Sequence, residues 1–141
     1  SVASVTSMRT NYDTLMDDFA SRADIGNLAN AERAAIETLL TFGEYISVSE
    51  ADALGVVLPG ALGDAVTEMR TESPDERTVD GFVSVVAERQ GFGTTATEAL
   101  RHTRAILAAI AAHGGHEELQ RTRDQLPDEF EPLFEPAELA G

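Results

Sequence analysis

Apolar residues recur at helical spacing along most of the chain, in stretches separated by glycine, proline or short polar segments. The first stripe begins at Tyr12, continues through Leu15, Met16 and Phe19, and ends before Gly26. Spacings of three and four residues place such side chains on one face of a helix. No useful length of the chain alternates with period two, as a half-buried strand would. The pattern therefore predicts an all-α protein.

Helix starts in the first half are predicted from residues that cap or open helices. Asn30 is placed as the N-cap of a second, longer helix. Ser49 and Asp52 have the form of a capping box, which opens a short third helix. Pro59 is placed at the start of a fourth helix, because a first helical position needs no backbone N–H.

The second half shows the same order of signals. A stripe from Val79 to Val86 predicts a helix that ends before Gly93, and Thr95 with Glu98 has the form of a second capping box. The long helix that follows is predicted to stop at the Gly-Gly pair 114–115. A short helix then leads to Pro127, and a brief last element carries Phe130, Leu133 and Phe134, which are expected to cover the core.

The two halves can be superposed on each other. Residues 13–26 match residues 80–93, and after one inserted residue 39–59 match 107–127. The match keeps apolar residues at equivalent helical positions. It also pairs Arg22 with Arg89 and the Leu-Pro corner at 58–59 with the one at 126–127. A unit of about 60 residues cannot bury its apolar face alone. We therefore predict two tandem copies of one helical unit, each with about four short helices, packed as a pseudo-two-fold bundle.

Polar stretches with no apolar period predict where these units begin and end. The polar, turn-forming sequence Ser-Pro-Asp-Glu at 73–76 is crossed by no apolar period, and the first ten residues are small and polar. The predicted division is a flexible N-terminal arm at 1–10, a first unit at 11–72, a linker at 73–78, a second unit at 79–136 and a tail at 137–141.

Charge is the most unusual feature of the composition. Asp and Glu number 25 against 10 basic residues, every one of them arginine, for a net charge of -15. Adaptation to molar salt in a halophilic archaeon is the leading explanation, and a GC-rich genome is the alternative. Because phosphate contacts need clustered basic side chains, neither nucleic acid nor an anionic membrane is an expected partner.

The lack of cysteine and of long apolar runs excludes further classes of function. The chain has no cysteine, which excludes disulfides, thiolate metal sites and a thiol nucleophile. Its apolar runs are much shorter than the roughly 20 residues that span a bilayer. A cytoplasmic protein is expected.

Histidine offers the main candidate chemistry. Residues 116–120 read His-Glu-Glu-Leu-Gln, one position short of the zinc-protease helix, because Gln120 stands where the second histidine ligand is needed. His113, His116 and Glu117 remain as weak metal-ligand candidates, although a histidine beside a Gly-Gly break more often interacts with a helix end. No catalytic residue, cofactor or metal site is predicted.

Two stretches carry a family resemblance. The first runs from Glu37 to Leu58-Pro59, and the second joins Phe82 to Arg89 with a long helix from Ala99 and the ending Gln125-Leu126-Pro127. Both resemble the prokaryotic family called domain of unknown function 2267, over most of residues 12–134. The first copy departs where Val57 replaces glutamine before Leu-Pro. The resemblance implies a helical fold and supplies no catalytic residues.

These observations favour a non-enzymatic protein-interaction or assembly module, binding an unidentified protein partner or its own copy. The first alternative is a small-molecule carrier with an apolar pocket between the repeats, lined by Phe19, Phe42, Val86 and Ile110. A weaker alternative is a metal-dependent hydrolase, which would use histidines 102, 113 or 116. A helix-turn-helix over residues 95–126 is possible in form, but the charge opposes DNA binding.

Overall fold

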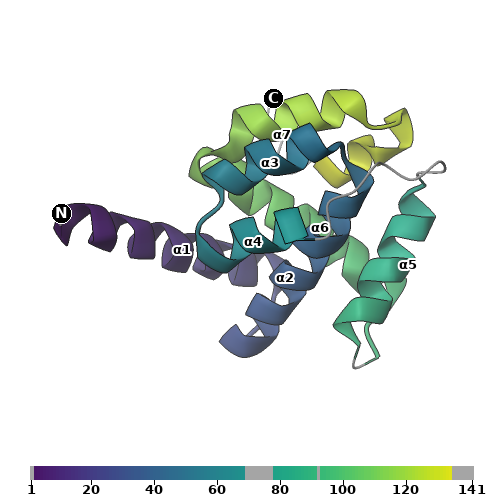
Figure 1. The fold of residues 1–141 in the computed structure, drawn as a ribbon. Coiled ribbons are helices and arrows are strands. Elements are labelled where there is room, and N and C mark those ends of the chain that lie inside the picture. Colours follow the sequence, from purple (N-terminus) through teal and green to yellow (C-terminus); the bar gives the residue numbers. More distant parts are fainter. Residues whose placement is uncertain (1, 69–77, 92, 135–141) are drawn as a thin grey trace.

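The computed structural model describes residues 2–68, 78–91 and 93–134, with side chains from Tyr12 onward. These residues form helices and turns without a strand, so the predicted all-α class is confirmed. The elements, drawn in Figure 1, are α1 (Val2–Ala23), α2 (Leu28–Tyr45), α3 (Val48–Val57), α4 (Gly60–Glu68), α5 (Val79–Gln90), α6 (Ala96–Ile110), η1 (Ala111–Gly115), α7 (His116–Gln125) and η2 (Asp128–Phe134). In the part of the chain that the structure describes, no helix is both long and apolar enough to cross a bilayer.

Two predicted helix starts in the first half are wrong by a few residues. The side chain of Asn27, not Asn30, caps α2 and accepts a hydrogen bond from the backbone N–H of Asn30 at 3.0 Å. Ser47, not Ser49, caps α3 and accepts from the N–H of Glu50 at 3.2 Å. In each case two residues of the same type lie close together, and the earlier one sits three positions before a helical N–H that it can satisfy.

In the second half, the observed helix starts agree better with the predicted ones. Thr95 and Glu98 form the predicted capping box, in which the side chain of each bonds to the backbone N–H of the other. Thr78 caps α5 by accepting from the N–H of Gly81 at 3.0 Å. The backbone N–H of Thr95 donates to the Glu98 carboxylate and, with the Thr95 hydroxyl, lowers the pKa of the Glu98 carboxyl, as expected for a group that accepts more strongly when ionised.

The break after α6 lies at the Gly-Gly pair, as predicted. His113 leaves helical geometry, and Gly114 has a φ of 109°, which an L-residue with a side chain rarely adopts. A Cβ at Gly115 would lie 2.4 Å from Cγ2 of Ile110. The second glycine is therefore required for close packing, and the chain turns here from α6 into α7.

The N-terminal boundary differs from the prediction. The backbone is already helical at Val2, whereas residues 1–10 were expected to form a flexible arm. No glycine or proline interrupts the sequence before Ala23, and extending a formed helix costs far less than nucleating one. Of the predicted linker at 73–78 only Thr78 is described, and the predicted tail at 137–141 lies outside the described residues.

The long helices α2 and α6 contact each other at the centre of the molecule, and the first helices of the two halves pack on opposite partners. Helix α1 packs chiefly on α6, while α5 packs on both α2 and α6 (Figure 1). Helices α3 and α7 lie side by side above them (Figure 1). Where α2 meets α4, a Cβ at Gly43 would lie 2.1 Å from the carbonyl oxygen of Val66, so only glycine allows this contact.

The C-terminal segment covers the core, as predicted. Phe130, Leu133 and Phe134 are at most 3 % exposed and are carried by the short 3-10 helix η2. Pro132 lies inside this helix, which is consistent with a tight single element rather than a continued α-helix. The apolar C-terminal residues that the structure describes are thus used within the fold and are not available to a partner.

Candidate functional site

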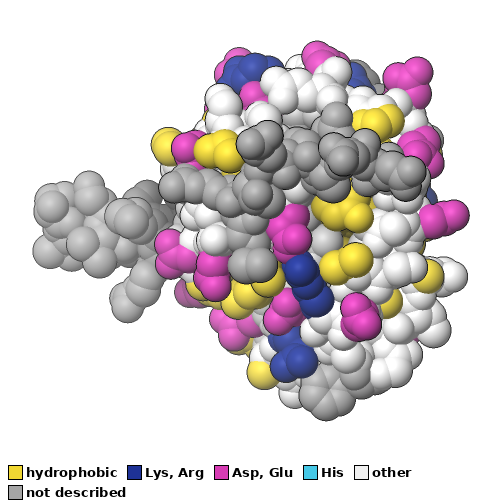
Figure 2. All heavy atoms as spheres, turned by 45° about the vertical axis from the view of Figure 1, so that its right-hand side comes forward, with side chains coloured by type: hydrophobic (Ala, Val, Ile, Leu, Met, Phe, Trp, Pro, Cys, Tyr) yellow, Lys and Arg dark blue, Asp and Glu magenta, His cyan; other side chains and the backbone are white. Residues whose placement is uncertain are grey.

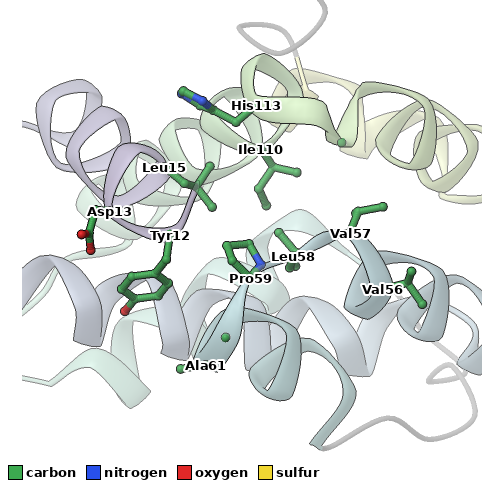
Figure 3. Close-up of a pocket in the computed structure, with 12 residues that line it drawn as sticks. Tyr12, Asp13, Leu15, Val56, Val57, Leu58, Pro59, Ala61, Ile110 and His113 are labelled. Atoms are coloured by element: carbon green, nitrogen blue, oxygen red, sulfur yellow. The ribbon is translucent and has the colours of Figure 1, made fainter. Parts of the chain in front are cut away.

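A cavity of about 610 Å³ lies between α1, the corner that joins α3 to α4, and the end of α6. This volume is within the range of small-molecule and side-chain sites, roughly 300 to 1,000 Å³. Figure 3 shows side chains from these three regions around it. Its lining consists of Tyr12, Asp13, Leu15, Val56, Val57, Leu58, Pro59, Gly60, Ala61, Ile110, His113 and Gly115.

The floor of the cavity is apolar and buried. Leu15 of α1, Leu58 after α3 and Ile110 at the end of α6 are each at most 6 % exposed. Pro59 ends the α3 segment, and Gly60 follows with a φ of 53°, which turns the chain sharply into α4. The corner therefore holds apolar side chains beside α1 and α6 without a helix crossing the space between them.

The mouth of the cavity is also apolar. Val56 is 85 % exposed and Val57 is 37 % exposed, and both stand at the end of α3. Only two other large apolar side chains in the described part of the chain are this open, Leu28 and Val48. Exposed apolar groups beside a concave apolar surface are a feature of binding sites.

Polar groups at the rim bond to acidic neighbours. The hydroxyl of Tyr12 donates to a carboxylate oxygen of Glu32 at 2.8 Å, and burial together with this bond raises the pKa of Tyr12 to about 12. The Nε2 atom of His113 lies 2.9 Å from Oδ2 of Asp18, and the imidazole points away from the cavity (Figure 3). Asp13 is exposed at the rim. The arrangement suits recognition of an apolar group with acidic side chains close by.

The three metal-ligand candidates of the sequence are not brought together. His113 pairs with Asp18, whereas His116 and Glu117 are exposed in the first turn of α7. Within the described residues, no three His, Asp or Glu side chains are grouped as a metal site requires. The helix break at Gly114 carries His113 to α1 and so separates its surroundings from those of the other two candidates.

Three of the four residues expected to line a carrier pocket are core residues instead. Phe19, Phe42 and Val86 are at most 1 % exposed and do not line this cavity, while Ile110 does. Sequence reasoning chose them because they lie on the apolar stripes, but side chains at the centre of a stripe fill the space between helices. The corner residues Val57 and Pro59 were missed, although consecutive valines before Leu-Pro break the helical stripe.

A second cavity, of about 460 Å³, is lined by the third histidine of the hydrolase hypothesis. The amide oxygen of Gln90 lies 2.8 Å from Nδ1 of His102, and the amide nitrogen donates to Thr38 Oγ1 at 3.1 Å. Burial lowers the pKa of His102, and the nearby Arg101 charge lowers it further. A neutral imidazole that donates from Nδ1 satisfies this network, which joins α2, α5 and α6.

Comparison with known proteins agrees with the helical and corner signals of the sequence. No curated protein matches the chain. One family model, described as "Uncharacterized conserved protein (DUF2267)", matches residues 12–133. This match extends from Tyr12 on α1 to Leu133 on η2 and therefore includes all the elements around the cavity. The chain belongs to the family of uncharacterized conserved proteins DUF2267.

Proposed function

We propose that the chain is a non-enzymatic interaction module that binds an apolar side chain of a partner protein in the cavity between α1, the α3–α4 corner and α6. The observation that carries this proposal is the exposure of Val56 and Val57 at the mouth of a cavity whose floor is buried. Exposed valines cost solvation free energy in the isolated chain, and a bound partner would remove them from water.

The polar groups at the site support binding over catalysis. Acid or base chemistry needs a titratable group that is directed at the substrate. At this cavity the Tyr12 hydroxyl is held by Glu32, and the His113 imidazole is held by Asp18. Both are oriented by neighbours outside the cavity, so they would fix the walls of the site rather than react with its contents.

The packing of the helices supports a two-fold arrangement of tandem units. Helix α1 packs chiefly on α6, and α5 packs on α2 as well as on α6; the α1–α6 and α5–α2 contacts are the pair that a two-fold axis through the α2–α6 contact would exchange. Between α3 and α7, the corresponding short helices of the two halves, Thr122 donates to the buried carboxylate of Glu50 at 3.1 Å. Glu50 and Glu118 occupy equivalent positions in the two matched halves. This arrangement places the cavity between the two proposed units.

The negative charge of the surface supports one proposal about the partner's charge and one about the salt around the protein. Acidic side chains are spread over the face in Figure 2, with arginines among them. The net charge of -15 favours a partner that is not itself acidic, and it opposes nucleic acid and anionic membranes. A cytoplasmic protein of a halophilic archaeon remains our interpretation of the same composition, and a homo-oligomer would require salt to screen the repulsion between copies.

A small-molecule carrier is the second candidate, and the volume of the cavity favours it. About 610 Å³ could hold an apolar ligand of moderate size, and Leu15, Leu58 and Ile110 would contact it. Native mass spectrometry of the purified protein tests this candidate. A reproducible mass above that of the chain, absent from a variant with a blocked cavity, would favour the carrier.

Affinity purification in molar KCl tests the interaction module, with a matched pair of variants. Ala61 is exposed and lines the cavity, so Ala61→Trp should block it, whereas Ala29→Trp introduces the same side chain at an exposed position of α2 outside it. We expect one near-stoichiometric protein with the wild type and with Ala29→Trp, and its loss with Ala61→Trp. A companion that Ala61→Trp retains would show that binding does not use the cavity.

A further inference from the structure

Five aromatic side chains that do not line the cavity form a cluster in the core. The Phe42 and Phe82 rings meet edge to face with centroids 6.3 Å apart, and Tyr45 meets Phe82 at 5.3 Å. Phe130 and Phe134 of η2 complete the cluster through contacts with Tyr45, Phe82 and Phe42. Edge-to-face contacts at these distances stabilise a pair beyond the area that it buries.

The internal match of the two halves pairs each cluster residue with a residue that has no benzene ring. Phe42 corresponds to Ile110, Tyr45 to His113, and Phe82 to Leu15. The two remaining rings, Phe130 and Phe134, lie beyond the matched ranges, and continuing the match with the same shift pairs them with Leu62 and Val66 of α4. Every ring of the cluster is therefore matched by a side chain without a benzene ring, with Phe42 and Tyr45 in the first half and Phe82, Phe130 and Phe134 in the second.

Three of these counterparts, Leu15, Ile110 and His113, line the cavity. The most direct substitution is at His113, where the side chain turns outward to Asp18, while Tyr45 at the matching position turns inward onto Phe82 and Phe130. Under the two-fold arrangement, the cavity is the space that aromatic rings fill on the other side. The cavity opens to solvent at Val56 and Val57, so a group from outside the chain can enter it.

We infer that the cavity receives an aromatic side chain from a basic segment of a partner protein. This inference rests on the proposed function and names the group that the cavity binds. The chain itself contains an example of such delivery, since the short helix η2 packs Phe130 against Phe82 and Phe134 against Phe42. A partner would likewise need only a short segment to deliver its ring.

The charge around the cavity identifies the flanking residues of the partner. Asp13 lines the cavity, and Asp18 and Glu32 hold its two polar rim groups. Arginine or lysine beside the aromatic residue would complement the negative charge of the exposed Asp13 at the rim. A second copy of the chain is a poor occupant, because it carries the same negative charge and the phenylalanines described in the structure are all buried.

Short synthetic peptides test the inference on the intact chain. The probe is Arg-Gly-Arg-Phe-Gly-Arg-Gly, compared with versions that carry Leu or Ala in place of Phe, and with one that carries Glu in place of every Arg. Binding is measured by titration calorimetry in about 0.5 M KCl, where long-range attraction is screened. We expect the Phe peptide to bind about threefold to tenfold more tightly than the Leu peptide, and the Glu peptide to bind most weakly.

Two variants make the result specific to the cavity. Leu15→Phe and Ile110→Phe each restore a ring that the other half has, so each should fill the cavity from inside and abolish the preference for the Phe peptide. Helix content by circular dichroism checks that each variant folds, and either variant alone is sufficient.

The possible outcomes separate this inference from the proposed function. If the Phe and Leu peptides bind equally and Ala61→Trp weakens both, the cavity binds apolar side chains and the aromatic inference is wrong. If no peptide responds to Ala61→Trp, Leu15→Phe or Ile110→Phe, both the inference and the proposed function fail. Equal binding of the Glu and Arg peptides would overturn the basic character of the partner.

Discussion

The Nε2 atom of His113 lies 2.9 Å from Oδ2 of Asp18, across the contact between the end of α6 and α1. The other carboxylate oxygen of Asp18 accepts from Nε of Arg22 at 2.7 Å, one helical turn later. Asp18 thus bonds both to Arg22 on its own helix and to His113 in η1, so one carboxylate ties α1 to the break after α6.

Replacing Asp18 should therefore weaken the fold slightly. We expect Asp18→Ala to lower the free energy of unfolding by about 0.5 to 1 kcal/mol, because both of its ionic partners are partly exposed. Asp17→Ala is the control, since Asp17 is the exposed neighbour on the same helix. Urea unfolding in low salt measures both variants, and equal effects would mean that the contacts of Asp18 contribute nothing to stability.

A larger side chain should leave stability unchanged at a position that lines the cavity and should lower it at a position in the core. Leu15→Phe adds volume beside a space of about 610 Å³, so we expect the melting temperature to stay unchanged or to rise. Leu39→Phe adds the same volume at a fully buried position that does not line the cavity, and overpacking there should cost about 1 to 3 kcal/mol. A similar loss in both variants would show that the cavity cannot accept a ring from α1.

Stability should fall in mildly acidic solution because of His102. Burial lowers the pKa of His102 in the folded state, so the unfolded chain, with a histidine pKa of about 6.5, binds the proton more tightly. The resulting stability is present above about pH 6.5 and is lost as the pH falls through the lower pKa of the folded state. Gln90, Arg101 and Glu98 face this group and set the size of the effect.

The His102→Asn variant isolates that contribution. Asparagine can still donate to the amide oxygen of Gln90 but does not titrate, so its unfolding free energy should fall less between about pH 7.5 and pH 5.5 than that of the wild type. Chemical unfolding at several pH values measures the difference. Parallel pH curves for the two proteins would contradict the prediction.

Salt should raise the melting temperature, because 25 acidic residues repel one another around a small body. Screening alone acts mostly below a few tenths molar, where the Debye length falls through about 10 Å. A rise that continues into molar KCl would therefore support halophilic adaptation, whereas a plateau near about 0.3 M would indicate simple screening. Scanning calorimetry over a KCl series distinguishes the two, and no rise at all would contradict the prediction.

Local signals predicted some helix ends correctly. Thr95 with Glu98 gave a capping box that the structure contains, and Gly114 marked the break after α6. The prediction slipped at Asn30 and Ser49, where a similar residue two or three positions earlier is the cap. Sequence alone does not decide between such neighbours, because the choice depends on which residues of the first turn are buried by other helices.

The candidate site was predicted only in part, for a similar reason. Apolar periodicity identifies residues that leave water, such as Phe19 and Phe42, but not which of them border an empty space. Ile110 was included because it lies on the stripe of α6, and Val56 was not, because it lies off any stripe. The predicted match of the two halves pairs Tyr45 with His113 and Phe82 with Leu15, and His113 and Leu15 both line the cavity.

The packing of α1 on α6 has a consequence for synthesis of the protein. Helix α1 ends at Ala23, and α6 begins only at Ala96, so the ribosome releases the first helix long before its main partner exists. The apolar face of α1 therefore stays exposed to water, or bound by chaperones, until α6 has been synthesised. Folding is then a late event of translation, and the abundance of carboxylates helps to keep the unfinished chain dissolved in the meantime.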